Sequence, residues 1–502
     1  MIPKKLQNWK PEKGFPFKCG LEIHTQLLTK HKLFSQSVNV PNCAPNANTS
    51  FFDLAFPGTF PKLNPEALLL ALKAAAALDA SISTTSSFDR KHYFYFDQPL
   101  GYQITQRFRP LARGGHLQLS KDYDDVLSDK LINIEQLQLE QDTAKLNYDD
   151  YDSLVSIDLN RANVPLIELV TKPDFENLLQ VRAFIKKYLG LVSHLGICSG
   201  DLENGAMRCD VNVSVAGGDR VEVKNLSSTS EVMAAAAYEY KRQVAQLKES
   251  IPVEQETRSW TGTKTVRTRS KEDAVDYRYV PDTELPFVHL DPSIADLIRA
   301  QLPEFPETVV RRLRNAPYGL EKKYAKFLVE SPLHLEYYYK LHSIIVGEHK
   351  QPSKVVNNWF VHELLGAFNK LGLSPDFTML PAEKYAALIL LVQNKEVTST
   401  SAKLLLLAML QPSEEIAEMS VEEMVDHYKL RNAAEAETGD LKTAVEEICK
   451  EIIEENQDAV EKIKAGKHLS IKFLVGIAMR TTQGKVDPKL FDETFKNLIY
   501  NE

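Results

Sequence analysis

The run DVNVSVAGGDRVEVK, residues 210–224, decides the fold of the region around it. Apolar and polar residues alternate on both sides of Gly217-Gly218, which is typical of a β-hairpin with one buried face. The apolar positions are Val211, Val213, Val215, Val221 and Val223. The polar positions are Asp210, Asn212, Ser214, Arg220, Glu222 and Lys224. We therefore expect the first face to pack on a core and the second to present carboxylates, an amide and cations.

Strand-like patterns of this kind extend from about residue 15 to about residue 290, where short β-like runs alternate with a few helical ones. The other strand-like runs are Gly20–Leu27, His92–Phe96, Leu131–Leu139 and Leu154–Leu159. Helices are predicted to begin at Asn64-Pro65, at Asp174 and at the capping box Ser228-x-x-Glu231.

From about residue 300 onward nearly every segment has a helical pattern. The predicted helices are 306–314, 323–329, 353–371, 381–393, 401–410 and 421–429. Residues 432–440 (NAAEAETGD) have the composition of a linker. Beyond them, acidic residues dominate 446–461 and basic residues dominate 462–489.

The composition is that of a globular protein, with 43% hydrophobic and 25% charged residues. Its 502 residues predict two to four domains, at about 150 residues per domain. The five cysteines form no CxxC pair, which argues against a disulfide framework or a zinc ribbon. No transmembrane helix or secretory signal is expected. Because the net charge is -8, any RNA-binding surface must be a local concentration of basic residues.

Glu22 and His24 lie two residues apart in the strand-like run GLEIHTQL, so their side chains share a face. Together with Glu140 and Glu222, which lie in or beside strand-like runs, they could hold a divalent cation. Mg²⁺ usually takes one or two carboxylates plus substrate phosphates, whereas histidine suits Mn²⁺ or Zn²⁺ better. The alternative is a set of strands whose polar face is simply solvated.

The run FDRKHYFYFDQPLGYQITQ, residues 88–106, is dense in aromatic and hydrogen-bonding side chains. Arg90 and Lys91 could bind phosphates, and Tyr93 shares a face with Lys91. The alternative is an aromatic core strand with a basic flank. The sequence contains no P-loop, no Gly-x-Ser-x-Gly elbow and no typical Cys/His nucleophile arrangement, so the chain is not expected to release ammonia from glutamine.

Basic residues near the C-terminus could contact RNA phosphates. They are Lys464, Lys467, Lys472, Arg480 and Lys485. The apolar positions between them follow helical spacing, so this segment could instead be a helix that pairs with the acidic one before it.

Motifs spread in one order over nearly the whole chain resemble the B subunit of the Asp/Glu-tRNA amidotransferases. The resembling segments are GLEIHTQL (20–27), FPGTFPKLN (56–64), FDRKHYFYFDQPLGYQITQ (88–106), LEQDTAKL (139–146), IDLNRANVPLIELVTKPD (157–174), ENGAMRCDVNVSV (203–215), EVKNLSS (222–228), QETRSW (255–260), RSKEDAVDYRYVPDTELP (269–286) and AGKHLSIKFLVGIAMRTTQGKVDP (465–488). This ordered set is more specific than any single motif.

The resemblance implies that the chain uses ATP and Mg²⁺, or Mn²⁺, to phosphorylate the side-chain carboxylate of Glu misacylated on tRNA-Gln. Ammonia from a partner, the amidase A subunit, would then displace phosphate and leave Gln-tRNA-Gln. A small third subunit is also implied. The fold implied is α+β: an antiparallel-sheet cradle related to glutamine synthetase (1–300), an all-helical domain (301–435) and a helical tRNA-binding tail (436–502).

Carried over residue by residue, the resemblance also implies the site. The implied metal ligands are Glu22, His24, Glu140 and Glu222. Lys224 would be catalytic beside them. The residues implied to face the nucleotide or line its cavity are Arg90, Lys91, Tyr93, Asp210 and Asn212.

The chain departs from the family pattern in three places. Gln141 follows Glu140 where the family usually has two adjacent acids, Leu100 stands where it usually has Lys, and the Cys pairs of a zinc knuckle are missing near Phe34. With the lysine-rich N-terminus, these departures favour a protein of the mitochondrial matrix over one of the bacterial cytoplasm. Two other functions share part of these features: a stand-alone ligase or kinase for a small carboxylate, and a non-catalytic tRNA-binding scaffold.

Overall fold

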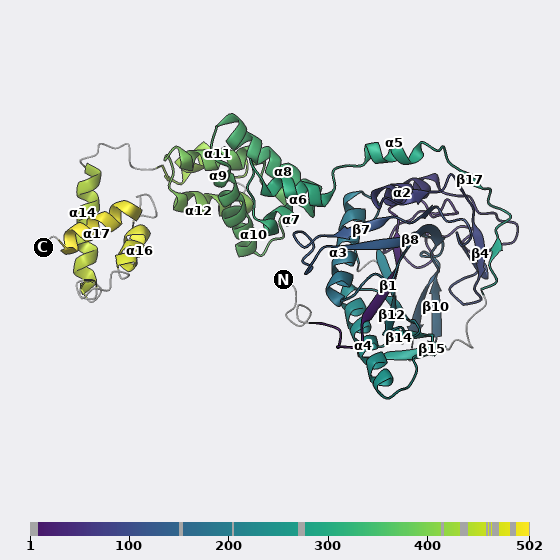
Figure 1. Ribbon diagram of the computed structural model, residues 1–502. Coiled ribbons are helices and arrows are strands. Elements are labelled where there is room, and N and C mark those ends of the chain that lie inside the picture. The colour runs from purple at the N-terminus through teal and green to yellow at the C-terminus, as the bar shows by residue number, and fades with distance from the viewer. Residues whose placement is uncertain are drawn as a thin grey trace. The chain divides into compact units, whose positions relative to one another are not determined.

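The computed structural model divides the chain into two compact units, residues 1–307 and 308–502 (Figure 1). The residues it describes are 9–149, 154–202, 205–269, 277–412, 416–431, 440–457, 460, 463, 471–481 and 488–500. Residues 432–439 of the predicted linker 432–440 and three of the predicted RNA contacts, Lys464, Lys467 and Lys485, lie outside this described part, whereas Asp440 is already helical.

A ten-stranded sheet organises the first unit. Its strands are β1 (Phe17–Gln26), β2 (Ser81–Ile82), β6 (Ala112–Arg113), β7 (His116–Leu119), β8 (Lys130–Gln141), β11 (Pro165–Thr171), β12 (Met207–Val215), β13 (Val221–Leu226), β14 (Glu256–Trp260) and β15 (Thr265–Arg269). They follow the order β15-β14-β13-β12-β1-β11-β8-β6-β2, and β7 also pairs with β8. Every pairing is antiparallel except β13–β14, which is parallel. The expected α+β class is confirmed, with a sheet that is mixed.

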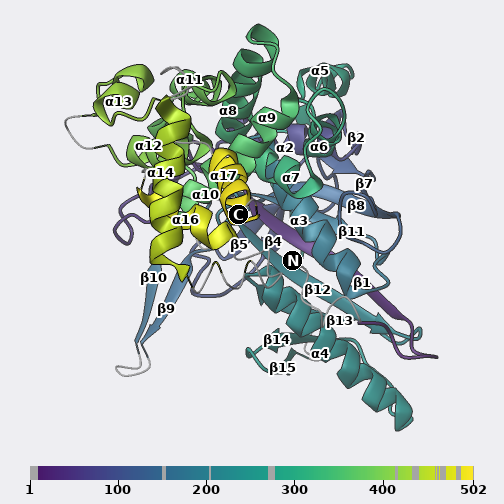
Figure 2. The same cartoon turned by 90° about the vertical axis from the view of Figure 1, so that its left-hand side faces the viewer.

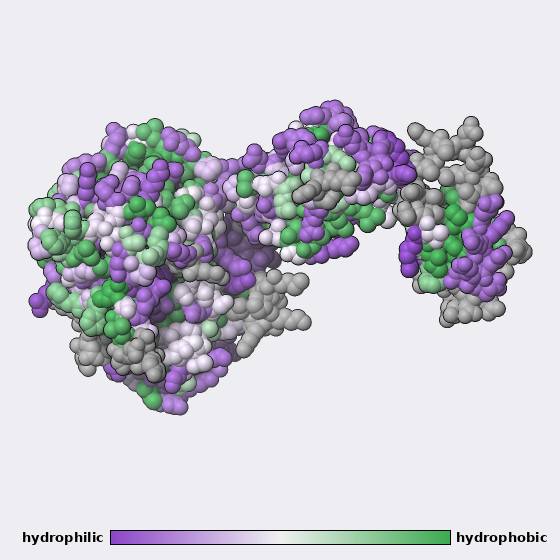
Figure 3. All heavy atoms as spheres, turned by 180° about the vertical axis from the view of Figure 1, so that it is seen from behind, coloured by the Kyte–Doolittle hydropathy of each residue, from purple (hydrophilic) through white to green (hydrophobic). Residues whose placement is uncertain are grey.

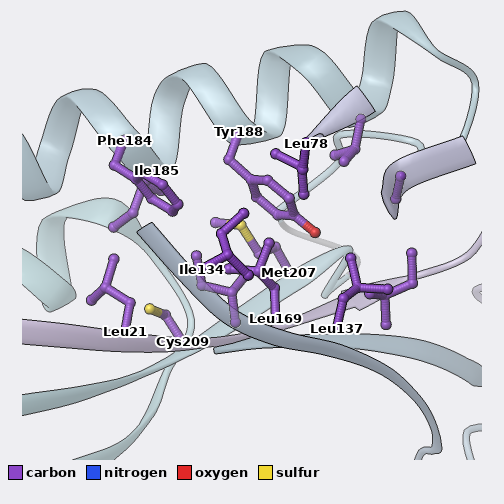
Figure 4. Close-up of a cluster of buried hydrophobic side chains, with 14 of the residues drawn as sticks. Leu21, Leu78, Ile134, Leu137, Leu169, Phe184, Ile185, Tyr188, Met207 and Cys209 are labelled. Atoms are coloured by element: carbon purple, nitrogen blue, oxygen red, sulfur yellow. The ribbon is translucent and has the colours of Figure 1, made fainter. Parts of the chain in front are cut away.

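The predicted hairpin is β12–β13, and its register pairs Val211 with Val223 and Asn212 with Glu222. All five valines are buried, on the face covered by helices α3 (Leu178–His194) and α4 (Thr229–Lys248). Figure 4 shows Phe184, Ile185 and Tyr188 of α3 above apolar side chains of the sheet. Each buried valine contributes roughly 1.5–3 kcal/mol of hydrophobic stabilisation, so this alternation is what fixes which face turns inward.

Local side-chain contacts explain where the helices of this unit begin. Helix α2 (Pro65–Ala77) begins after Asn64, whose side chain accepts from Glu66 N, as predicted. Helix α4 begins after Ser228, but the Glu231 carboxylate accepts from Ser227 rather than completing the predicted capping box. The predicted start of α3 at Asp174 is wrong, because that carboxylate accepts from Asn133 and the cap is Asn177. Helix α5 (Ile294–Gln301) is the last complete helix of this unit.

Three smaller sheets flank the large one. They are β9–β10 (Lys145–Asp149, Leu154–Asp158), β3–β17 (Thr85–Ser86, Val288–His289) and β16-β4-β5 (Val280–Pro281, Asp89–His92, Tyr102–Thr105). The predicted strand His92–Phe96 is wrong. Strand β4 ends at His92, and the chain turns back so that Tyr93 N donates to the carbonyl of Gly101, which has a φ of 71°.

Beyond α5 the described residues are almost entirely helical, as expected. The helices are α6 (Pro306–Arg314), α7 (Lys322–Val329), α8 (Pro332–His342), α9 (Ser353–Asn358), α10 (Leu365–Leu371), α11 (Ala382–Gln393), α12 (Ser399–Leu410) and α13 (Val421–His427), with π-helices at Ser343–Glu348 and Trp359–Leu364 and a 3₁₀ turn at Phe377–Met379. The predicted helix 353–371 thus contains a π-helical turn. Helix α8 was not predicted, because its three consecutive tyrosines interrupt the helical spacing of aliphatic residues.

Three further helices share a core of their own: α14 (Asp440–Glu455), α16 (Ile471–Thr481) and α17 (Pro488–Tyr500). Cys449, Leu474 and Phe491 are fully buried in it. Among the described helices of the chain, none is both long and apolar enough to cross a membrane.

Candidate active site

The polar face of the large sheet gathers acidic side chains from strands that are distant in sequence. Direct cross-strand partners include Glu22 with Asp210 and His24 with Glu168. Opposing side chains in an antiparallel pair lie about 5 Å apart. Among the residues that the structure describes, two groups of three possible ligands result, and within each group one ligand atom of each residue lies within 4.8 Å of the others.

The first group, which we call cluster A, contains His24, Glu140 and Glu168. His24 Nε2 lies 3.6 Å from Glu140 Oε1 and 4.0 Å from Glu168 Oε1. Two glutamines hold the carboxylates in place: Gln103 Nε2 donates to Glu140 at 2.7 Å, and Gln138 Nε2 donates to Glu168.

The charges in cluster A are strongly coupled. Burial disfavours the imidazolium of His24, but contact with Glu140 and the charge of Glu168 outweigh it and raise its pKa to about 9. Burial likewise opposes ionisation of Glu140, yet Lys91 and His24 lower its pKa to about 2. Burial and the Glu140 charge raise the pKa of Glu168 to about 7. Two carboxylates therefore compete for one imidazole and one ammonium.

The second group, cluster B, contains Glu22, Asp210 and Glu222. Lys224 Nζ lies 3.1 Å from Asp210 Oδ2 and 3.0 Å from Glu222 Oε1, and these two charges raise the lysine pKa against the effect of burial. Asn212 Nδ2 donates to Glu22 Oε1 at 2.9 Å. The backbone N–H of Asn225, a residue with a φ of 61°, donates to Asp210 Oδ1.

Both clusters have the donor chemistry for a divalent cation. Carboxylate oxygens suit Mg²⁺, and the imidazole of cluster A suits Mn²⁺ as well. Asn212 Oδ1 is buried and has no hydrogen-bond partner among the described residues. This oxygen is therefore free to act as one further ligand of a cation in cluster B. The residues present therefore fit such an ion.

A cavity of about 830 Å³ opens on this face. Its lining includes members of both clusters, Glu22, Glu140, Glu168 and Glu222, together with Lys91 and Lys224. Lys91 Nζ lies 4.9 Å from the ring centre of Tyr277. Arg107, Arg113 and Arg220 also line the cavity, so cations stand on the same walls as the acids.

The structure distributes the predicted site residues over both clusters and beyond. Glu22, Glu222, Lys224, Asp210 and Asn212 lie in or beside cluster B. His24 and Glu140 lie in cluster A, with Lys91 close enough to shift the pKa of Glu140. The four predicted metal ligands therefore form two pairs.

Arg90 and Tyr93 are not part of the described cavity lining. Arg90 Nε lies 2.6 Å from Asp282 and its Nη2 lies 3.1 Å from Glu284. Tyr93 packs on Tyr95 with ring centres 4.4 Å apart. Lys472 and Arg480, the predicted RNA contacts within the described part, are both exposed on α16.

Sequence reasoning missed Glu168, Gln103 and Gln138. A signal for Glu168 was present, because it is the single acid in the run PLIELVT, between Ile167 and Leu169. An isolated carboxylate inside an apolar strand needs a compensating group. The glutamines carry no such signal.

Comparison with known proteins places this geometry in context. Residues 17–296 match the family described as GatB/GatE catalytic domain, so the sheet with its cavity belongs to that class of catalytic domain. Residues 342–499 match the family described as GatB domain.

Similarity to individual relatives extends over the whole chain. The chain is 60% identical to the B subunit of mitochondrial glutamyl-tRNA(Gln) amidotransferase from Clavispora lusitaniae, over 99% of this chain and 94% of the relative. It is 54% identical to the proteins of the same name from Debaryomyces hansenii, over 98% and 96% of the two chains, and Scheffersomyces stipitis, over 98% and 97%. The chain therefore belongs to the GatB family of amidotransferase B subunits, and the family prediction is confirmed.

Proposed function

We propose that this chain phosphorylates the side-chain carboxylate of Glu carried by tRNA-Gln, using ATP, and then amidates it with ammonia from a partner amidase. The observation that carries this proposal is the convergence of four carboxylates of clusters A and B with two half-buried lysines, Lys91 and Lys224, on one cavity. The name that the relatives carry, glutamyl-tRNA(Gln) amidotransferase, supports the substrate.

The chemistry needs two displacements. A carboxylate oxygen of the substrate attacks the γ-phosphorus of ATP, the bond to the bridging oxygen breaks, and ADP leaves with that electron pair. Ammonia then attacks the acyl carbon, the C–O bond to phosphate breaks, and the nitrogen loses a proton. Inorganic phosphate and the amide are the products.

The residues of the cavity meet the needs of the first displacement. Lys91 and Lys224 are ammonium groups held beside carboxylates, positioned to bind phosphate oxygens. Clusters A and B would hold Mg²⁺ or Mn²⁺, which neutralises charge on the phosphates when bound. Gln103 and Gln138 keep the carboxylates oriented. Enclosure by the cavity would limit hydrolysis of the acyl phosphate.

Further parts of the proposal follow from the family. The large, mostly antiparallel sheet would be a cradle of the glutamine synthetase kind. The partners would be the amidase A subunit, Glu-tRNA-Gln and a small third subunit, in the mitochondrial matrix. Lys472 and Arg480 would contact the tRNA together with Lys464, Lys467 and Lys485.

The test uses the complex of the full chain with its amidase partner. Glu222→Gln should lower tRNA-dependent ADP formation and Gln-tRNA formation by about 10³-fold, because a phosphate-neutralising site is lost. The matched control is Glu135→Gln, which lies on the cavity wall outside both clusters and should retain activity within about twofold.

Partner and tRNA binding should survive both changes. Unchanged amidation in Glu222→Gln would show that the chain is a scaffold. Equal ADP formation with free glutamate in place of Glu-tRNA-Gln would show a stand-alone carboxylate kinase.

A further inference from the structure

Surface hydropathy does not single out a second site on the face of the first unit seen in Figure 3, because hydrophobic and hydrophilic residues are intermixed there. The contacts around the cavity do distinguish one segment, residues 277–285, which we call the strap. Its Tyr277 and Tyr279 line the cavity, with ring centres 6.2 Å apart. Lys91 Nζ lies 4.9 Å from the ring centre of Tyr277, and the guanidinium carbon of Arg107 lies 5.7 Å from that of Tyr279. Both rings of the strap therefore contact cations of the cavity wall.

Backbone hydrogen bonds attach the strap to strand β4 at two places. His92 N donates to the carbonyl of Tyr277 at 2.8 Å, and Asp282 N donates to the carbonyl of Phe88 at 2.9 Å. Between them strand β16 pairs with β4, which in turn runs beside β5 (Figure 2). Strand β16 is only two residues long, so backbone pairing alone holds the strap weakly. Side-chain contacts must therefore complete its attachment.

Arg90 supplies such a contact. Its Nε donates to Asp282 Oδ2 at 2.6 Å, and its Nη2 lies 3.1 Å from Glu284 Oε2. The guanidinium also lies over the ring of Tyr102 on β5, 4.4 Å from the ring centre. The other carboxylate oxygen of Asp282 accepts from the backbone N–H groups of Glu284 and Leu285. One buried carboxylate thus joins the end of the strap to an arginine that is stacked on a neighbouring strand. We call this pair, Arg90 and Asp282, the clamp.

The clamp lies outside the cavity. Successive side chains of a strand point to opposite faces, and on β4 it is Lys91 that belongs to the cavity lining. Arg90 points to the other face, where two acids of the strap balance its charge. This arrangement makes Arg90 a poor ligand for a phosphate and a good tie for the strap.

We propose that Arg90 is a positioning residue, which together with Asp282 locks the strap so that Tyr277 holds the ammonium of Lys91 in place for the phosphates of ATP. This role rests on the proposed function, which gives Lys91 a phosphate to bind. The ring of Tyr277 restrains Lys91 from the strap, while the charge of Glu140 attracts it from the large sheet. A lysine side chain is flexible, so loss of the first restraint leaves its ammonium to the acid alone.

Two properties distinguish the clamp from a direct phosphate ligand. A guanidinium is planar and stacks on Tyr102 while its N–H groups reach Asp282, whereas a lysine ammonium is a compact point charge. The clamp therefore needs arginine at position 90. It also needs both carboxylate oxygens at position 282, because asparagine has one acceptor oxygen and must give up either Arg90 or the backbone N–H groups. A direct phosphate ligand would not depend on Asp282.

The experiment compares variants of the full chain in complex with its amidase partner. Arg90→Lys and Asp282→Asn should each weaken ATP binding in calorimetry, and raise the KM for ATP, about tenfold. The double variant should lie within about twofold of either single one, because both changes remove the same clamp. Partial unfolding would lower kcat and leave KM unchanged, so the rise in KM identifies a positioning role. ATP affinity that is unchanged in Asp282→Asn would overturn the proposal.

Hydrogen exchange of backbone amides provides a readout that needs no turnover. The amides of Asp282, Glu284 and Leu285 are hydrogen-bonded at the clamp. Their exchange should be at least about tenfold faster in Arg90→Lys and Asp282→Asn. Glu284→Gln, which changes only the half-exposed acid, should shift exchange in the same direction even if the buried changes prevent folding. Unchanged exchange of the strap in the folded variants would overturn the proposal.

Arg242→Lys is the matched control. The side chains of Arg242 and its partner Glu239 are 18% and 0% exposed, against 21% and 0% for Arg90 and Asp282. The control should leave ATP affinity and exchange of the strap within about twofold of the unmodified chain. An equal loss of ATP affinity in the control would show that Arg90 acts only through general stability, and would overturn the proposal.

Failure of the proposed function has a different signature. If the unmodified complex binds ATP but forms no Gln-tRNA, the proposed function fails, while weaker ATP binding and faster strap exchange in the two variants would still establish the clamp. If the unmodified complex forms Gln-tRNA and both variants do so with an unchanged KM for ATP, the positioning role fails and the proposed function stands.

Discussion

Glu239 and Glu140 are both buried carboxylates of the first unit, but they differ in how fully neighbouring donors and cations compensate the negative charge. Glu239 accepts from Arg242 at 2.6 Å, from Thr265 at 2.9 Å and from Gln243 at 2.9 Å. Arg258 lies 3.5 Å away. Glu140 Oε1 accepts a hydrogen bond from Gln103 Nε2 at 2.7 Å and lies 3.6 Å from His24 Nε2. Glu168 competes with it for the same imidazole.

The balance of charge separates the two regions. Around Glu239 the ion pairs join two acids, Glu239 and Glu256, to three arginines, Arg242, Arg258 and Arg267. On the polar sheet face, five acids of clusters A and B share two lysines and one histidine. The first region is complete without a ligand, and the second gains from any bound cation. A network in which acids outnumber the neighbouring cations therefore indicates a cation-binding site more reliably than burial alone does.

The largest expected effect on stability comes from the complete network. Glu239→Ala should lower the free energy of unfolding by about 3 kcal/mol, because it removes the fully buried acid of the network and leaves the half-buried Arg242 and Arg258 with Glu256 alone. Glu140→Gln should change it by less than about 1 kcal/mol, since it also removes repulsion from Glu168. Urea denaturation of both variants in the presence of EDTA measures these two changes in the free energy of unfolding. Equal losses would remove the distinction between the two regions.

A divalent cation should produce the next largest effect. Mn²⁺ at about 100 times its Kd should stabilise the chain by about 2.7 kcal/mol for one site. Denaturation with and without the metal measures the gain. Glu168→Gln should reduce it, whereas a substitution in the Glu239 network, such as Gln243→Ala, should leave it unchanged. The absence of any gain in the unmodified chain would mean that the acids are not a metal site.

The smallest effect is a dependence on pH in the metal-free chain. Because the pKa of His24 is raised to about 9, its imidazolium contributes stability fully below the unfolded value of about 6.5 and loses it as the pH rises through about 9. Between pH 6.5 and 9.5 the free energy of unfolding should therefore fall by about 2 kcal/mol more than in His24→Asn. A profile that is the same in both proteins would mean that His24 is not coupled to the acids.

Local patterns predicted the parts of this molecule that local physics controls. The alternation at 210–224 identified both faces of the hairpin, and the cap at Asn64 located α2. Register then brought Glu22 opposite Asp210, which spacing along one strand cannot reveal. Arg90 shows that a local pattern can also suggest a role that a distant residue changes. A cation beside Lys91 suggested a phosphate ligand, but its neighbour Asp282 is 192 residues away in sequence.

The parallel pairing of β13 with β14 has a consequence for how the chain folds. A parallel neighbour cannot follow through a tight turn, so α4 must cross the sheet before β14 can take its place. Until then β13, with Glu222 and Lys224, is the outermost strand. A nascent chain that ends near residue 250 would thus present these two side chains on an open edge, and the wall formed by Glu256 and Thr257 would close later, before that of Tyr277 and Tyr279.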